Sequence, residues 1–256
     1  AEGMGAARGH QRPRRHPRTP AGVDTLRRWN GIAIDASGLD HTPVAAGETR
    51  VFGEQFGPTR ASRAMAIVHI AMFDAVNAIV GGYESYTRLP HAPFDVSLTA
   101  AVAQAAHDTL VALFSSQTPS FDDALAADLA TIHDGRFKSN GISLGARAAG
   151  AILALRADDG AAHPEPHLGV EHPTSDEPGH WRQDPISQNT LALGAYWGDC
   201  TPFSLQSADQ FRTPPPPALD SAEYAAAFAE TKALGGDVVV LDGPDLGEVE
   251  RHADRA

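Results

Sequence analysis

The chain has 256 residues, 42% of them hydrophobic and 7% aromatic, which is enough apolar side chain for a substantial core. Its formal net charge of −12 argues against a nucleic-acid partner, since such a surface is basic. The one cysteine, Cys200, excludes an intramolecular disulfide and a zinc site built from cysteines. We expect Cys200 to be a small hydrophobe near Trp197; a nucleophilic role would need a nearby base.

Residues 1–22 are predicted to form a disordered basic arm. The segment is of low complexity, with arginines interspersed with prolines: Arg8, Arg12, Arg14, Arg15, Arg18, Pro13, Pro17 and Pro20. An anion-binding arm is the alternative interpretation.

No apolar stretch of the kind found in a signal peptide follows the basic arm, and the cellular compartment stays open. No run of 18 apolar residues lacks a charge, so neither a membrane-spanning helix nor a membrane partner is expected.

Apolar residues at three- and four-residue steps predict helices along the rest of the chain. The first is expected at 23–35, followed by a loop at 36–57. The longest apolar segment predicts a helix over 59–80, with Thr59 as its N-cap and Gly81 at its end. We expect this helix to be the most buried element of the protein.

Further helices are predicted at 97–114, 120–132, 141–158 and from Asp220 to Gly235, the second of them opened by a capping box at Ser120–Asp123. Between them, residues 160–219 are rich in proline and form a long loop-rich segment. The fold class is therefore all-α, a helical bundle of about six helices without an extended sheet. Abundant alanine suits closely packed helices.

The 59–80 helix carries a polar line among its apolar neighbours. Arg63, Asp74 and Asn77 share one side of it with two isoleucines, and His69 lies nearby. Polar groups that a core helix buries need hydrogen-bond partners. The sequence thus predicts buried polarity in the bundle.

The segment from Arg60 to Ile79 resembles the N-terminal half of bacterial vanadium-dependent haloperoxidases, members of the acid-phosphatase-like (PAP2) superfamily. Other segments similar to this family occur in the family's order: Trp29–Asn30, Tyr83–Tyr86, 98–113, Ile152–Gly160, Pro178–Arg182, Trp197 with Pro202–Phe203, Gln210–Leu219 and Ser221–Gly235. Each segment is short, and it is their occurrence together in this order that is specific for the family. The set covers roughly residues 24–236. The resemblance implies an incomplete helical bundle of this family's type, occupying 23–236.

The family holds vanadate as a phosphate mimic and uses it to oxidise halide with peroxide. Arginine and lysine donate to the vanadate oxygens, one histidine binds the metal and another acts on peroxide. The resemblance implies that these residues lie in three motifs of the C-terminal half: Lys followed by Arg-Pro, Ser-Gly-His, and Ser-Arg followed by His. The first two are missing here, since Lys138 and Arg147 have the wrong spacing and Ser-Gly-His does not occur.

The third motif has a partial counterpart in Ser62, Arg63 and His69, with Ile67 in place of its glycine. Six residues place Arg63 and His69 about 120° apart around a helix, so they do not converge on one ion. We expect a core helix with a hydrogen-bonded His69; the alternatives are an anion site, or His69 or Asp74 lining a pocket completed by the other half. No catalytic, vanadate-binding or metal-binding residue is assigned, and no vanadate is expected on this chain.

Residues 237–256 do not resemble the family. Three consecutive valines and an acidic tail replace further helices, and a frame change or truncation near residue 237 is the expected cause. The missing C-terminal half would then be the principal partner. Three functions stay open: part of a haloperoxidase-like protein, part of a PAP2-type phosphatase-like protein, or a non-catalytic helical module that scaffolds or forms a homodimer.

Histidines and carboxylates gather in the loop-rich segment: His163, His167, His172 and His180 with Glu165, Glu171, Asp176 and Glu177. These groups suit zinc, nickel or copper, but their spacing matches no standard site, and a solvated loop is expected. His107–Asp108 and His133–Asp134 are interpreted as helix-surface or helix-end pairs and not catalytic dyads. Neither a serine nucleophile motif nor a phosphate-binding glycine loop occurs.

Overall fold

A computed structural model describes residues 21–93 and 95–235, and the chain divides into two compact units, 1–163 and 164–256. The described residues contain six α-helices and no strand, only the isolated bridges His167–Leu191 and Leu168–His172. The predicted all-α class and the number of helices are thus confirmed. Of the predicted disordered arm at 1–22, residues 21–22 are helical, so the prediction is wrong for them, and residues 1–20 lie outside the described residues, as does the predicted tail at 237–256.

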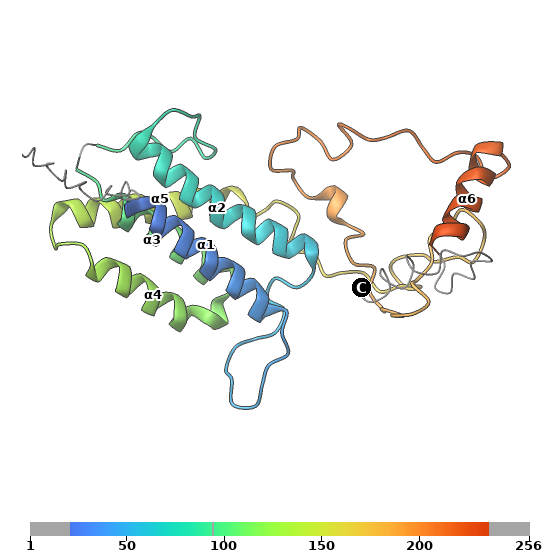
Figure 1. Ribbon diagram of the computed structural model, residues 1–256, viewed down its shortest axis with the longest axis horizontal. Coiled ribbons are helices and arrows are strands. Elements are labelled where there is room, and N and C mark those ends of the chain that lie inside the picture. The colour runs from blue at the N-terminus through green and yellow to red at the C-terminus, as the bar shows by residue number, and fades with distance from the viewer. Residues whose placement is uncertain (1–20, 94, 236–256) are drawn as a thin grey trace, which may run out of the picture. The chain divides into compact units, whose positions relative to one another are not determined.

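Five helices form a packed bundle in the first unit: α1 (Ala21–Asp40), α2 (Pro58–Val80), α3 (Leu98–Leu113), α4 (Thr118–Ala130) and α5 (Arg136–Leu155). Figure 1 shows α1, α2 and α4 running alongside one another, with α3 and α5 behind them. Helix α3 packs against each of the other four. It is the centre of the bundle.

The expectation that the 59–80 helix is the most buried element is therefore wrong. Nine of the 16 residues of α3 are buried, against nine of the 23 residues of α2. The reason is side-chain size. Five buried alanines between Ala100 and Ala106 let neighbouring helices approach α3 on several sides at once, whereas the larger side chains of α2 were the stronger signal in the sequence.

Glycines on α5 bring it close to α3. A Cβ atom added to Gly145 would lie against the Ala101 carbonyl, 2.7 Å from Gln104 Cβ and 2.9 Å from Ala105 N. A Cβ atom on Gly141 would lie 2.8 Å from that of Ala100. Real Cβ atoms do not tolerate such distances, so the α3–α5 contact depends on both glycines.

The two ends of α2 are set by proline and glycine and not by a side-chain cap. Pro58 stands in the first turn, where its missing N–H has no partner to lose, and Gly57 precedes it without a side-chain cap. The predicted N-cap role of Thr59 is therefore wrong. The predicted end is confirmed, because Gly81 adopts φ 73° and its N–H donates to Asn77 O at 2.8 Å.

Helix α1 extends to Asp40, beyond the predicted end at residue 35. Ala36 and Asp40 continue its buried face, and the Asp40 carboxylate accepts from the backbone N–H groups of Glu54 (2.7 Å) and Gln55 (2.9 Å). These contacts between residues far apart in the sequence stabilise the last turn. The connecting loop is correspondingly shorter, covering residues 41–57.

Two other helices begin earlier than predicted. Helix α4 starts at Thr118, with Pro119 in its first turn, and the Ser120 hydroxyl donates to Gln117 O. The predicted capping box at Ser120–Asp123 is therefore wrong. Helix α5 starts at Arg136, directly after Gly135. The predicted opening of α3 is confirmed, since the Ser97 hydroxyl accepts from Ala100 N at 3.2 Å.

The second unit is mostly irregular, as predicted for residues 160–219. Its described part, residues 164–235, contains one 3-10 turn, η2 (Trp197–Asp199), and helix α6 (Ala222–Leu234). Glu165 organises the turn by accepting from Gly194 N (2.9 Å) and from the Trp197 indole N–H (3.2 Å). Ser221 caps α6 by accepting from Tyr224 N, which confirms the predicted helix start.

Among the described residues, α2 alone is long and apolar enough to cross a membrane by length and composition. Half of its most apolar 18-residue window is buried inside the protein. A core helix passes the same test, and α2 packs against α3 and α5.

Candidate functional site

The polar side chains of α2 form the candidate site, because they are the chemically versatile groups in an otherwise apolar helix. They are Arg63, His69, Asp74 and Asn77, of which Asp74 and Asn77 are buried. Their partners decide whether they can serve a ligand.

Arg63 contacts the segment that follows α5. Its Nε donates to Asp159 Oδ2 at 2.7 Å, and a terminal guanidinium nitrogen donates to Arg156 O at 2.7 Å. The Arg156 Nε donates to the same Asp159 oxygen at 2.9 Å. In this Arg63–Asp159–Arg156 cluster the side chains of Asp159 and Arg156 are buried, with 2% and 4% exposure, whereas that of Arg63 is 16% exposed.

Electrostatics in the cluster favour an ionised Asp159. Burial alone would raise the pKa of this carboxyl group. The hydrogen bonds from Arg63 and from Ala161 N–H, together with the charges of Arg63 and Arg156, outweigh burial and lower the pKa below its ordinary value. The charges of Arg63 and Arg156 are therefore paired with Asp159.

A cavity of about 250 Å³ lies beside this cluster. Arg60 and Arg63 line it together with the carboxylates of Glu54 and Asp159. Arg60 donates to His163 O, and Glu54 accepts from the hydroxyl groups of Ser115 (2.7 Å) and Ser116 (2.5 Å). The cavity is therefore lined by two arginines and two carboxylates, whose charges cancel. Such a lining does not favour the binding of a multiply charged anion.

His69 lies on a different side of α2. Its Nδ1 is 2.7 Å from Met65 O, one turn earlier in the same helix, and its Nε2 is 2.9 Å from the Asn30 side-chain oxygen in α1. Both ring nitrogens are within hydrogen-bond distance of protein atoms. This is the hydrogen-bonded core histidine that the sequence predicts.

Asp74 and Asn77 hold the loop after α2. The buried Asp74 carboxylate accepts from the Ser85 hydroxyl (2.9 Å), Tyr86 N (2.9 Å), Thr87 N (2.8 Å) and the Thr87 hydroxyl (2.6 Å). Asn77 donates to Tyr83 O at 2.9 Å and accepts from Tyr83 N at 3.1 Å. These bonds give both residues a structural role in the described unit.

The described residues do not fit vanadate. A bound oxoanion needs several cationic donors directed at one point and an imidazole nitrogen for the metal. Arg63 donates to Asp159, and both nitrogens of His69 face protein atoms. We therefore derive no chemical step through vanadate on these residues.

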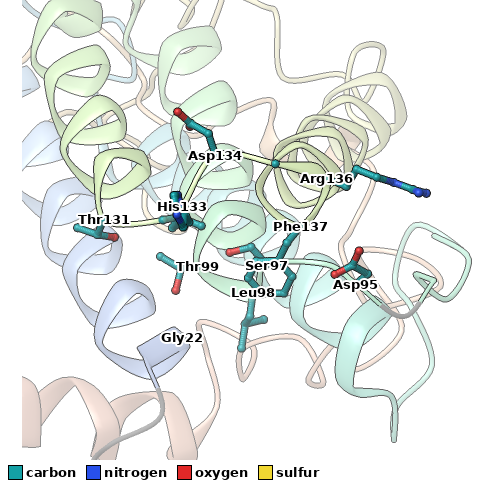
Figure 2. Close-up of a pocket in the computed structure, with 12 residues that line it drawn as sticks. Gly22, Asp95, Ser97, Leu98, Thr99, Thr131, His133, Asp134, Arg136 and Phe137 are labelled. Atoms are coloured by element: carbon teal, nitrogen blue, oxygen red, sulfur yellow. The ribbon is translucent and has the colours of Figure 1, made fainter.

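A larger cavity, of about 910 Å³, opens at the end of the bundle where α3 and α5 begin (Figure 2). Figure 2 shows Leu98, Thr99 and His133 gathered around it, whereas the Arg136 side chain extends away from them. The adjacent Asp134 accepts from Lys138 at 2.8 Å, a hydrogen bond that lowers the pKa of this exposed carboxyl group. His133 and Asp134 are thus helix-end residues, as predicted.

The histidines of the loop-rich segment have backbone or aromatic neighbours. The His172 ring lies edge-on to Trp181 with centroids 5.5 Å apart, and Glu171 accepts from His167 N at 2.8 Å. In residues 21–93 and 95–235, no group of three or more His, Cys, Asp or Glu is arranged to hold a metal ion. Half-buried Cys200 follows η2, and its N–H donates to Trp197 O.

His107 differs from the other histidines because it contacts two carboxylates. Its Nδ1 is 2.7 Å from Asp108 Oδ1, and its Nε2 is 2.8 Å from Asp122 Oδ1 in α4. The hydrogen bond to Asp108, followed after the opposing effect of burial by the bond to Asp122, raises the pKa of His107. The sequence analysis considered His107 together with Asp108 only, because Asp122 lies 15 residues away in the chain.

Sequence reasoning also missed the partners of α2. Asn30 and Asp159 come from segments 39 and 96 residues away from the side chains they bind. The sequence showed only that polar residues lie beside the apolar stripe of this helix. Polar residues occupy such positions on most surface helices, so the pattern did not identify their partners. No protein-family model, curated protein or solved structure matches this chain.

Proposed function

We propose that residues 23–235 form the N-terminal helical part of a vanadium-dependent haloperoxidase-like protein. The supporting observation is that several segments of the resemblance meet at α2. Trp29–Asn30 supplies the partner of His69, Tyr83–Tyr86 supplies partners of Asp74 and Asn77, and Ile152–Gly160 supplies Asp159 for Arg63. Residues that resemble one family in order thus contact α2 through three separate sets of polar contacts, as expected for a shared helical framework.

In this proposal the first unit is a scaffold and not the vanadate site. When bound, vanadate would supply the activation of peroxide, and its ligands would come from the C-terminal half. The polar residues of α2 are used to join α1, the 83–87 loop and the segment after α5. Their role is to position helices on which the other half packs.

The decisive experiment reads the gene beyond codon 236 in all three frames. We expect one frame to encode Lys followed by Arg-Pro, then Ser-Gly-His, then Arg followed by His. Protein expressed from that restored frame should bind orthovanadate and brominate an organic acceptor with peroxide, whereas the present chain should do neither. Absence of the three motifs from every frame would exclude the proposal, and phosphate-ester hydrolysis without bromination would indicate the PAP2-type phosphatase alternative.

A second candidate function, a helical module that pairs with another copy of itself, is supported by the outward face of α2. Phe73 and Val80 are exposed there, seven residues apart, and Phe73 contacts Tyr83 with ring centroids 6.2 Å apart. Phe73, Val80 and Tyr83 are exposed by 39%, 69% and 77%. Contiguous exposed apolar side chains mark interaction surfaces. Sedimentation of the parent and of Phe73→Asp tests this candidate: a dimer lost in the variant supports it, and a monomeric parent excludes it.

A further inference from the structure

We propose that His107 is a proton-dependent latch that holds α4 against α3. The ring stands between two carboxylates, one on each helix, and its side chain is 12% exposed. This inference is independent of the proposed function.

The hydrogen-bond chemistry requires a proton on both nitrogens. A carboxylate only accepts, so a 2.7 Å contact from Nδ1 to Asp108 and a 2.8 Å contact from Nε2 to Asp122 both need an N–H donor. Only the imidazolium supplies two. Asp108 is itself fixed by a bond from the Gln104 amide at 2.7 Å, so the ring is held on the α3 side. When the ring loses a proton, the contact to the more exposed Asp122 is the one that opens.

The surroundings of the ring are asymmetric. Helix α3 contributes Asp108 and α4 contributes Asp122, and these two act on its charge. Helix α1 contributes the Trp29 ring, edge-on with centroids 6.5 Å apart. The neighbouring cation on α1, Arg28, is paired with Asp128 of α4 and so offsets a different carboxylate.

Helix α4 has few other attachments. Only Phe121 and Asp128 are buried among its 13 residues. Asp128 accepts from the Trp29 indole at 2.7 Å and from Arg28, which fixes the C-terminal part of the helix. The chain just before α4 is held by the buried Gln117, whose amide donates to Ala36 O at 2.9 Å, and within the N-terminal part of the helix Phe121 and the neighbouring Asp122 make the contacts. Losing one bond there should therefore loosen α4 locally and not unfold the bundle.

The direction with pH follows from the raised pKa of His107. A histidine whose pKa is higher in the folded state stabilises that state fully below the unfolded value, about 6.5. The contribution is lost as pH rises through the higher folded pKa. The latch is therefore closed below about pH 6.5 and opens as pH rises through the higher folded pKa of His107.

Hydrogen exchange of the full chain, followed by mass spectrometry between pH 6 and 8.5, tests the latch. Rates are converted to protection factors, which removes the intrinsic pH dependence of exchange. In the parent we expect protection of residues 118–126 to fall about three- to tenfold across this range, while α5 stays unchanged. In Asp122→Asn, protection should be low already at pH 6 and vary little with pH. Asp123→Asn, an exposed neighbour on the same helix, is the matched control and should follow the parent.

Imidazole NMR of the same proteins supplies the second readout. We expect the pKa of His107 to exceed 6.5 in the parent and in Asp123→Asn and to fall in Asp122→Asn. A parent whose α4 protection does not depend on pH would overturn the latch. Equal pH dependence in the parent and in Asp122→Asn, or an unchanged His107 pKa in that variant, would do the same.

Discussion

Arg63 and His69 stand six residues apart on α2 and bind partners on different sides of the bundle. Arg63 donates to Asp159 in the segment after α5, whereas His69 meets Asn30 of α1. The separation agrees with the angle that their spacing predicts on a helix. Arg63 and His69 therefore join α2 to other segments of this unit, and we expect no anion site at Ser62, Arg63 and His69.

The present chain is expected to bind no orthovanadate tightly and to show no bromide oxidation with peroxide. The reason is that Arg63 and His69 do not converge and already have protein partners. Vanadium NMR during an orthovanadate titration, together with a bromination assay, measures both properties. Stoichiometric binding, or turnover that His69→Ala abolishes, would contradict this expectation and assign the active site to α2.

Asp159→Asn is expected to destabilise the first unit by about 3 kcal/mol, because it leaves the buried Arg156 and the half-buried Arg63 beside a neutral amide. Urea denaturation at pH 7 measures the loss. The adjacent, exposed Asp158→Asn is the control and should change the free energy of unfolding by less than about 0.5 kcal/mol.

The same cluster predicts the effect of acid. The pKa of Asp159 is lower in the folded state, so its stabilisation is present above the ordinary aspartate value of 3.8 and is lost as pH falls through the lower folded pKa. The difference in stability between the parent and Asp159→Asn should therefore shrink when denaturation is repeated below about pH 4. A difference that stays constant with pH would show that the carboxylate charge is unimportant.

Gly145→Ala is expected to cost about 1–3 kcal/mol, since the new methyl group would meet the backbone of α3 at Ala101 and Ala105. Gly150→Ala on the same helix is the matched control. No atom lies within 4 Å of a Cβ atom there, and the exposed site should gain up to about 1 kcal/mol from helix propensity. Chemical denaturation distinguishes the two, and equal effects would mean that α3 and α5 are less closely packed.

Met72→Asp is expected to unfold the first unit, because Met72 is 1% exposed and a carboxylate there has no solvent. Phe73→Asp, one residue away but 39% exposed, should lower stability by only about 1 kcal/mol. Thermal melting followed by circular dichroism gives the comparison. If Met72→Asp melts within about two degrees of the parent, the buried face of α2 has been assigned to the wrong residues.

The sequence by itself determined the helical class and most of the helix positions. Apolar periodicity is a local property, and Ser97, Ser221 and Gly81 act on the backbone within a few residues, so their effects can be read without the fold. The end of α1 was missed because distant residues intervened. Asp40 belongs to α1 because its carboxylate binds the backbone at Glu54 and Gln55, which no local pattern shows.

Only the tertiary structure decided which helix is central and which partners the polar groups have. The alanines of α3 give a weak apolar signal, yet their small size lets four helices pack around it. The joining of His107 to Asp122 likewise depends on how α3 and α4 approach one another. Burial and pairing are properties of surfaces brought together by folding, whereas periodicity records only which face of a helix is apolar.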